Sequence, residues 1–217
     1  MDDDTIPFPD ALENLLNAAE LLDGKASYLK SMVYDVDGEL AGDVTPDLRA
    51  GSNTYHDWHE RLTDGLLKTR ETTFVSLLVN SKTVETCGLP CKYYFIWSDD
   101  HEYGLRLTEY YGPGYFCGHS KVYHKRPGIK TLSVLDEPNT PRLRNYYYMY
   151  RNDMTNDIIY YGKKRALKQM LRSMITALKA LVHPQGFKRF RIVLAGTVSG
   201  LWFWRKVRRF IKSQVKA

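Results

Sequence analysis

Two short acidic segments carry the side chains best suited to chemistry. The first is Asp2-Asp3-Asp4, in the stretch Met1–Pro7, which reads as the end of a strand running into a loop. Aspartates two residues apart in an extended segment can direct their carboxylates to one side. These hard oxygen ligands suit Mg²⁺ or Mn²⁺, and either ion can bind a diphosphate. Taken alone, a disordered acidic terminus is the simpler interpretation of this segment.

The second segment follows an aromatic stretch and reads Trp97-Ser98-Asp99-Asp100-His101-Glu102-Tyr103. The pattern predicts a buried aromatic strand that leads adjacent carboxylates to the start of a helix, where the helix dipole favours their ionised form. An ionised carboxylate at that position can act as a general base. Capping of the helix by Asp99 would not require Asp100 and Glu102, so the segment favours a functional interpretation.

A single histidine, His124, ends a third predicted strand. Imidazole suits Mn²⁺ better than Mg²⁺. A lone histidine is more often structural, so this residue gains meaning only together with the aspartates.

The composition excludes several classes of protein. Of 217 residues, 43% are apolar and 26% charged, which fits neither a disordered chain nor a multispanning membrane protein. No apolar run is long enough to span a bilayer, and the start of the chain lacks the features of a signal peptide. Three cysteines are too few for a disulfide scaffold and lack the second pair of a zinc site. A reducing compartment is therefore the default expectation.

The charge is divided unevenly along the chain. Residues 1–140 contain 13 Lys+Arg against 23 Asp+Glu, a balance of −10. Residues 141–217 contain 18 Lys+Arg and two aspartates, a balance of +16. We therefore expect an acidic module over 1–140 and a basic region over 141–217. A basic region of this kind binds phosphates, either in nucleic acid or at an anionic membrane surface.

The hydrophobic pattern of the first module predicts an α/β fold with a mixed sheet and flanking helices. Strands are expected over 26–36, 72–79 and 115–123, an extended stretch over 92–97, and helices over 9–22, 82–87 and 99–110. Polar loops are expected from the first of these strands to about residue 53, and from 124 to 141.

The basic region is expected to be helical over 142–161, 163–182 and 187–212. The middle helix is amphipathic, with one apolar face formed by Leu167, Met170, Leu171, Met174, Ile175, Leu178 and Leu181. In the last helix, arginines bracket the aromatic residues Phe190, Trp202, Phe203 and Trp204, which suits a helix lying in a membrane interface. A helical hairpin packed on the domain is an equally good interpretation. Nucleic-acid binding is less favoured, because no recognised module accompanies the charge.

Four segments together resemble inverting, family-two glycosyltransferases of the GT-A fold. In order, they are MDDDTIPFPDALENLL, FVSLLVNSKTVETCGLP, YYFIWSDDHEYGLRL and GYFCGHSKVYHK. Among the members of this family, the chain resembles bacterial galactofuranosyltransferases and rhamnosyltransferases of cell-surface polysaccharides, to which RNYYYMYRN and the basic C-terminal helices are also similar. The resemblance spans nearly the whole chain. The ordered set is specific, whereas any one segment is not.

The resemblance implies a metal site built around the first aspartates. Asp2 and Asp4 would hold Mn²⁺ or Mg²⁺, and His124 would complete the ligand set. Asp3 would lie near the ribose or phosphate of a nucleotide sugar, UDP- or dTDP-linked. The acceptor would be a lipid-linked or growing glycan, with the enzyme peripheral at the cytoplasmic face of the plasma membrane.

The resemblance also implies roles in the second acidic segment. Asp100 would be the catalytic base, which takes a proton from an acceptor hydroxyl that attacks the anomeric carbon. Asp99 would bind sugar or acceptor hydroxyls. Trp97, Glu102 and Arg106 would bind substrate or support the site from the helix. No covalent intermediate is needed, so the anomeric configuration inverts.

In this family the aspartates follow the first strands of the nucleotide-binding sheet, whereas here one residue precedes them. A fragment, a misplaced start and a decayed gene product would each explain this difference. We therefore expect the 217-residue chain to bind nucleotide sugar poorly, and its activity in isolation is left open.

Three other functions remain open. A non-catalytic membrane-surface or partner-binding remnant of such an enzyme is the first alternative. A metal-dependent phosphoryl hydrolase is the second, although the sequence offers no further nucleophile or bridging carboxylate for it. Nucleic-acid binding by the basic region is the third, and strongly salt-dependent affinity for DNA would reveal it.

Overall fold

The structure is a computed structural model that describes residues 1–41, 44–49, 57–126 and 133–216. The chain forms two compact units. The first unit comprises residues 1–89, 103–130 and 215–217, and the second comprises 90–102 and 131–214. The sequence placed one boundary near residue 140 and did not indicate that 90–102 groups with the C-terminal helices.

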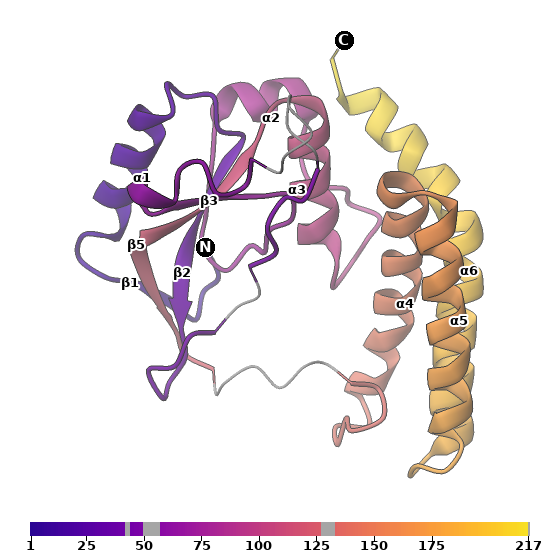
Figure 1. Cartoon of the computed structure of the whole chain (residues 1–217). Coiled ribbons are helices and arrows are strands. Elements are labelled where there is room, and N and C mark those ends of the chain that lie inside the picture. Colours follow the sequence, from indigo (N-terminus) through magenta and orange to yellow (C-terminus); the bar gives the residue numbers. More distant parts are fainter. Residues whose placement is uncertain (42–43, 50–56, 127–132, 217) are drawn as a thin grey trace. The chain divides into compact units, whose positions relative to one another are not determined.

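The first unit contains a curled, mixed sheet (Figure 1). Its strands are β1 (Thr5–Pro7), β2 (Tyr28–Tyr34), β3 (Leu66–Thr69), β4 (Leu77–Val79) and β5 (Gly114–His124). The order is β1-β5-β2-β4, and β3 also pairs with β5. β2 and β5 are parallel and the other pairs are antiparallel, which confirms the predicted α/β class with a mixed sheet.

Helices cover both faces of this sheet. Leu29 of β2 packs in a cluster with buried residues of α1 (Ala11–Leu21). Its neighbour Tyr28 points to the other face, since side chains alternate along a strand. There it joins residues of α2 (Ser81–Cys87) and of the later turns of α3 (Asp99–Tyr110). The alternation of β2 therefore gives the first unit three layers.

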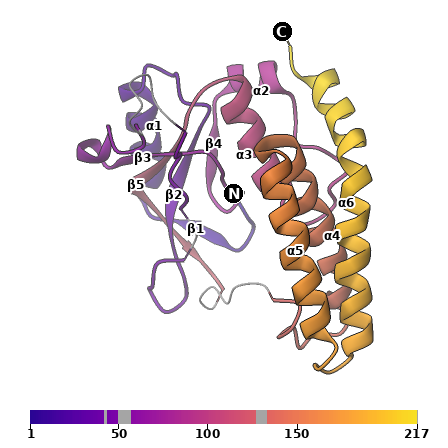
Figure 2. The same ribbon diagram turned by 45° about the vertical axis from the view of Figure 1, so that its right-hand side comes forward.

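The second unit is helical (Figure 2). Its elements are the 3-10 turn η2 (Arg142–Arg144), α4 (Asn145–Asn156), the π-helical turn η3 (Asp157–Tyr161), α5 (Lys163–Ala180) and α6 (Gly186–Gln214). Two glycines let α6 approach α4 closely. A Cβ at Gly196 would lie 2.5 Å from the Tyr147 carbonyl oxygen, and one at Gly200 would lie 2.6 Å from the Met154 Cβ.

The predicted helices match the structure to within a few residues, whereas three strand predictions need correction. The strand expected over 72–79 is reduced to β4, and β3 was not predicted. The stretch 92–97 is irregular rather than extended, with a positive φ at Phe95 and Trp97. β1 follows the first aspartates instead of preceding them. Both predicted loops lie partly outside the described residues.

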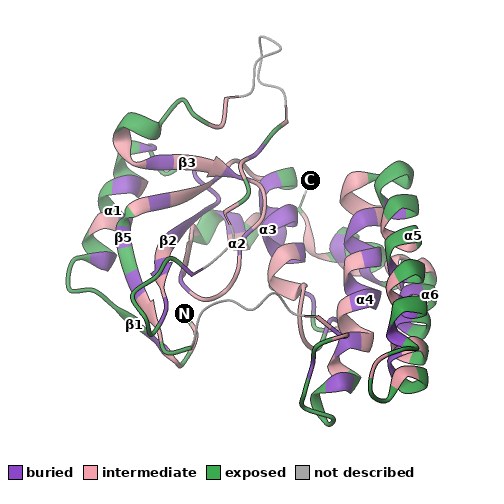
Figure 3. Cartoon of the chain, turned by 60° about the horizontal axis from the view of Figure 1, so that its bottom comes forward, coloured by how far each residue is buried: buried purple, intermediate pink, exposed green. Residues whose placement is uncertain are grey.

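The amphipathic pattern of α5 is present, but most of its large apolar residues are exposed to solvent. Exposed positions run along α5 in Figure 3. Its buried residues are the small Ala166, Ser173, Ala177 and Ala180. Across the described residues, no helix is both long and apolar enough to cross a membrane.

Candidate functional site

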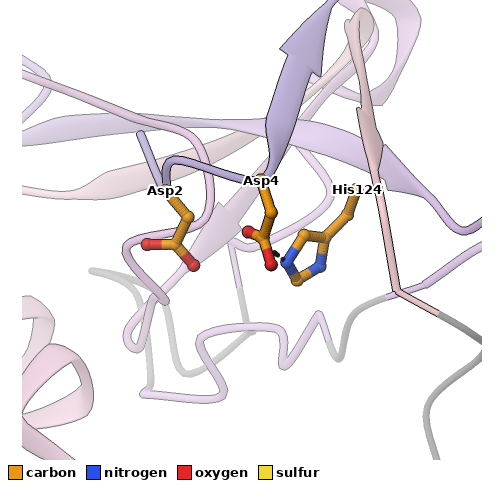
Figure 4. Close-up of side chains that lie close together, drawn as sticks. All are labelled: Asp2, Asp4 and His124. Atoms are coloured by element: carbon orange, nitrogen blue, oxygen red, sulfur yellow. Dashed lines mark hydrogen bonds and ion pairs between the residues drawn. The ribbon is translucent and has the colours of Figure 1, made fainter.

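The three predicted metal ligands lie together in the first unit. Each of Asp2, Asp4 and His124 offers one ligand atom, and these three atoms lie within 4.8 Å of one another. Figure 4 shows the three side chains together. Thr5, at the start of β1, is paired with His124, at the end of β5. This antiparallel pairing brings residues more than 100 positions apart into contact, and the Nε2 of His124 lies 3.0 Å from the Oδ1 of Asp4.

Backbone hydrogen bonds fix the turn that carries the aspartates. The Asp2 N–H donates to the Val75 carbonyl at 3.1 Å, and the Thr5 N–H donates to the Asp2 carbonyl at 3.2 Å. The Lys125 N–H donates to the Asp4 carbonyl at 2.9 Å. The turn is thus tied to both neighbouring segments, so the carboxylates do not depend on a free terminus for their position.

Arg126 is a partner of Asp4 that the sequence did not reveal. Its Nε donates to the Oδ2 of Asp4 at 2.6 Å. This hydrogen bond, together with the charges of Arg126 and His124, lowers the pKa of Asp4 against the opposing effect of burial. Asp4 is therefore held as a carboxylate, with one oxygen facing Arg126 and the other facing His124.

The donor set fits a divalent cation. Two carboxylates and an imidazole are ligands that Mn²⁺ accepts, and Mg²⁺ accepts the carboxylates. Asp2 and Asp4 are both only partly buried, so an ion could reach them. Asp3 is exposed and lies outside the cluster. Arg126 already hydrogen-bonds one oxygen of Asp4. It would therefore compete with a metal ion for that ligand atom.

The predicted catalytic pair, Asp99 and Asp100, lies in the second unit, whereas the metal-ligand candidates belong to the first. Both residues are partly buried and begin α3, as the sequence predicted. The His101 N–H donates to the Oδ1 of Asp100 at 2.8 Å. Position at a helix start favours ionised carboxylates.

The segment leading into this pair has an unusual backbone. Phe95, Trp97 and Ser98 have φ values of 74°, 58° and 61°, in the left-handed region that suits glycine. Each such residue costs on the order of 1–3 kcal/mol and persists only where its surroundings hold it in place. Strained residues of this kind are concentrated at active sites and ligand clamps.

Helix α4 holds this strained segment by hydrogen bonds from its side chains. The fully buried Asn152 donates from its Nδ2 to the carbonyls of Tyr94, Ile96 and Trp97 at 3.3, 3.1 and 2.7 Å. Arg151 donates from its Nη2 to the Tyr93 and Tyr94 carbonyls.

Two further α4 residues hold Ser98, the residue before the aspartates. Asn156 donates from its Nδ2 to the Ser98 carbonyl, and the Ser98 hydroxyl donates to Asp153 at 2.5 Å. Sequence reasoning missed this network. Its signal was the charged and amide triplet Arg151-Asn152-Asp153 inside a tyrosine-rich helix.

The remaining predicted substrate-binding residues have protein partners. Trp97 packs against the Tyr146 ring, with centroids 5.0 Å apart. Glu102 is fully buried and accepts a hydrogen bond from the Tyr160 hydroxyl at 2.8 Å. Arg106 is also fully buried and donates to the carbonyls of Cys87 and Leu89 at 3.0 Å each. These contacts give Glu102 and Arg106 structural roles, and substrate binding by them stays a prediction.

A groove of about 740 Å³ lies within the second unit, and the strained Phe95 is part of its wall. Aromatic and cationic side chains line it, among them Phe95, Tyr147, Phe187, Arg144, Lys188 and Arg191. This combination suits a ligand with an apolar part and an anionic group.

No protein-family model matches the chain, and no curated protein matches it significantly. The family resemblance noted in the sequence therefore receives no support from these comparisons. The functional argument rests on the geometry of the two acidic segments.

Proposed function

We propose that this protein is a metal-dependent, inverting glycosyltransferase that moves a sugar from a nucleotide-sugar donor to a hydroxyl of a cell-surface glycan acceptor. The observation that carries the proposal is the cluster of Asp2, Asp4 and His124. The family resemblance implies that a spaced aspartate pair and a distant strand-end histidine are the ligands, and one ligand atom of each lies within 4.8 Å of the other two. The mixed sheet is compatible with a GT-A type domain, which remains part of the proposal.

The metal site would bind the donor through its diphosphate. Asp2, Asp4 and His124 would hold Mn²⁺ or Mg²⁺, and Asp3 would lie near the ribose or phosphate of a UDP- or dTDP-linked sugar. A divalent ion bound there would stabilise the negative charge of the departing diphosphate. Arg126 would limit access of the ion to Asp4, since it already hydrogen-bonds one oxygen.

The catalytic step would be carried by the second acidic segment. Asp100 would accept the proton of the acceptor hydroxyl as that oxygen bonds to the anomeric carbon. The bond from this carbon to the diphosphate breaks at the same time, and the nucleoside diphosphate leaves. Asp99 would orient sugar or acceptor hydroxyls, with Trp97, Glu102 and Arg106 supporting them. The segment from Tyr93 to Ser98, held by α4, would give the base a fixed position, as catalysis by proximity requires.

The acceptor would be a lipid-linked or growing glycan, with the protein at the cytoplasmic face of the plasma membrane. The groove beside Phe95 supports this acceptor class, because its aromatic wall and its three cations would accommodate a lipid phosphate. A second candidate function is a non-catalytic module at a membrane surface. The exposed apolar face of α5 favours it as strongly as it favours a membrane-bound enzyme.

A donor-panel transfer assay tests the catalytic proposal. The chain is incubated with Mn²⁺, UDP- or dTDP-sugars and a bacterial lipid extract, and both nucleoside diphosphate release and labelled lipid are measured. We expect Asp100→Asn to lose at least about 100-fold in rate, the scale of general-base catalysis. Asp136→Asn is the matched control, because Asp136 is an exposed carboxylate of the same unit.

Two outcomes would overturn the proposal. In the first, the wild-type chain neither transfers sugar from any donor nor binds a UDP- or dTDP-sugar in the presence of Mn²⁺, which leaves the non-catalytic module as the better candidate. In the second, the chain cleaves a simple phosphate ester without any sugar acceptor and Asp100→Asn transfers as fast as wild type, which indicates a phosphoryl hydrolase.

A further inference from the structure

The outer face of α5 is a continuous apolar stripe that runs into the turn after the helix. Seven large side chains on it are between 47% and 88% exposed: Leu167, Leu171, Met174, Ile175, Leu178, Leu181 and Val182. Most are spaced by three or four residues, so they lie on one side of the helix. Isolated exposed apolar residues are ordinary, whereas a contiguous patch of this kind marks an interaction surface.

The packing of α5 explains why these residues remain outside. Ala166, Ser173, Ala177 and Ala180 are the buried residues of this helix, with at most 8% exposure. They recur at helical spacing on a different side from the stripe. The helix packs within its unit through small side chains, and its large apolar residues contribute little to that core. The stripe therefore has a role other than folding of the second unit.

Helix α6 adds a second exposed apolar set with a spacing of four residues. Leu194, Val198 and Trp202 are 39%, 46% and 61% exposed. They lie away from Gly196 and Gly200, the positions where α6 contacts α4. Each of the two helices thus turns its exposed apolar residues away from its own buried side.

The structure divides the aromatic residues of α6 that the sequence grouped together. Phe203 lies 3.9 Å from the Arg151 guanidinium, measured to the ring centroid, and Trp204 donates its indole N–H to the Leu201 carbonyl. Phe190 packs against the core of the second unit. Only Trp202 of the four is exposed, so the surface available for docking is centred on α5 instead.

The charges beside the stripe have one sign. Residues 163–216 contain 15 Lys and Arg and no Asp or Glu. On α5, exposed cations lie next to the apolar side chains: Lys164, Lys168, Arg172 and Lys179. Within the described part of the chain, none of these four forms an ion pair with a carboxylate. A two-fold contact between copies of this face would bring these cations together without compensating charge. An anionic surface would neutralise them.

We propose that the exposed face of α5 docks on an anionic lipid bilayer. The apolar side chains enter the boundary between headgroups and acyl chains, and the lysines and arginines bind lipid phosphates. Helix α5 would lie along the bilayer surface, since no helix of the described residues is long and apolar enough to cross it. This inference does not depend on glycosyl transfer, since it uses none of the residues assigned to catalysis or metal binding.

Vesicle sedimentation tests the docking surface without Mn²⁺ or nucleotide sugar. The full chain is mixed with phosphatidylcholine vesicles, with or without phosphatidylserine. The test variant is Leu167→Glu/Leu171→Glu on α5. The matched control is Leu12→Glu/Leu16→Glu on α1, where two leucines of the same spacing are also exposed.

We expect wild type and the α1 variant to bind the phosphatidylserine vesicles and to release them at high salt, since lipid electrostatics are screened. The α5 variant should partition at least about tenfold more weakly, because it places two carboxylates in the apolar contact. Zwitterionic vesicles should bind all three proteins weakly.

Four results would overturn the proposal. Wild type could fail to bind anionic vesicles, or both variants could bind as tightly as wild type. Light scattering could also show a dimer that the α5 variant alone converts to a monomer, with no vesicle binding, which would assign the face to a second copy of the chain. Salt-dependent binding to DNA in the absence of vesicle binding would assign the cations to nucleic acid instead.

Discussion

Asp4 is shared between two partners whose effects on a metal ion are opposite. His124 contacts one carboxylate oxygen and can itself serve as a ligand, whereas Arg126 contacts the other at 2.6 Å and brings a positive charge. The Arg126 side chain is 61% exposed, so its removal opens no cavity in the core. The balance between these partners determines whether Asp4 is available to a cation.

Replacement of Arg126 by alanine should therefore strengthen Mn²⁺ binding. Asp4 gains a free oxygen and loses a repulsive neighbour of the ion, while its carboxylate remains ionised near neutral pH. We expect the affinity to rise by about tenfold, the scale on which outer-shell partners change metal affinity. Calorimetric titration with Mn²⁺ measures this change.

Arg61→Ala is the control for the arginine substitution. Arg61 forms an exposed ion pair with Asp64 at 3.3 Å in the same unit, so its loss changes the net charge equally. An equal increase in both variants would indicate a general charge effect. Unchanged affinity in Arg126→Ala would mean that Asp4 and Arg126 form a structural ion pair only.

Tyr146 makes the stability of the second unit sensitive to alkaline pH. Burial and the hydrogen bond that its hydroxyl donates to Glu137 raise the pKa of Tyr146 to about 12. An unfolded tyrosine ionises near pH 10. Folding therefore retains a proton that the unfolded chain releases, and this stabilisation is complete below pH 10 and is lost as the pH rises toward 12.

Urea unfolding at several pH values between 9 and 11 should show a decline in the free energy of unfolding. The Tyr146→Phe variant should be less stable at pH 8, because the buried Glu137 loses one of its hydrogen-bond donors, and its stability should fall less steeply with pH. Burial also raises the pKa of Tyr150, so some decline will remain. An identical slope for both proteins would contradict the role given to Tyr146.

Sequence reasoning located some residues of the candidate site and missed others. The family resemblance named Asp2, Asp4 and His124 as ligands, although the aspartates lie in a turn before β1 instead of after a strand. Neither Arg126 nor Asn152 received a role from the resemblance, and their partners lie 122 positions away and 55–58 positions away, respectively. No local pattern encodes a hydrogen bond to a backbone carbonyl in another segment.

At the scale of elements, the main finding is that α4 positions the segment before the catalytic candidates. Asn152 hydrogen-bonds three carbonyls of a segment that contains three residues with positive φ, and Arg151 also donates to one of them, the Tyr94 carbonyl. The amide is needed specifically, because a carboxylate has no proton to donate. The helix therefore holds in place the chain segment that precedes Asp99 and Asp100.

Asn152→Asp should loosen the segment that precedes Asp99 and Asp100. The new carboxylate repels the three carbonyls, and each buried group left without its hydrogen bond costs about 1–3 kcal/mol. We expect faster amide hydrogen exchange over residues 93–100 and reduced transfer activity, while α4 to α6 remain folded. Hydrogen exchange followed by mass spectrometry measures the local effect.

Asn145→Asp is the matched control, since it makes the same chemical change at the start of the same helix. A negative charge there interacts favourably with the helix dipole. If exchange over residues 93–100 is equally slow in both variants and in wild type, the side chain of Asn152 does not hold the segment.

Helices were easier to predict from the sequence than strands were. The period of 3.6 residues extends over many positions in α5 and α6, so their bounds agree with prediction to within two residues. Short strands such as β3 and β4 offer three or four residues, too few for a reliable alternation. The α5 pattern predicted an apolar face but not whether that face is buried or exposed. Small residues on another side of the helix pack it into the unit instead.

At the scale of the whole molecule, composition and structure divide the chain differently. The charge changes sign near residue 140, whereas the second unit also takes in residues 90–102. The catalytic candidates, Asp99 and Asp100, lie near the end of this stretch. They are thus acidic residues within an otherwise basic unit. Composition predicts which regions attract phosphates, but it cannot show which segments, distant in sequence, fold together.

The most direct test of the central claim is electron paramagnetic resonance of Mn²⁺ added to the intact chain, before and after addition of UDP. The proposal predicts one tightly bound ion whose signal acquires phosphorus coupling from the diphosphate. Asp2→Asn should weaken this binding by at least about tenfold, while Asp10→Asn, a change at an exposed carboxylate of the same unit, should leave it unchanged. No bound Mn²⁺, or binding that is equal in Asp2→Asn and wild type, would contradict the assignment of a metal site and of the transferase built on it.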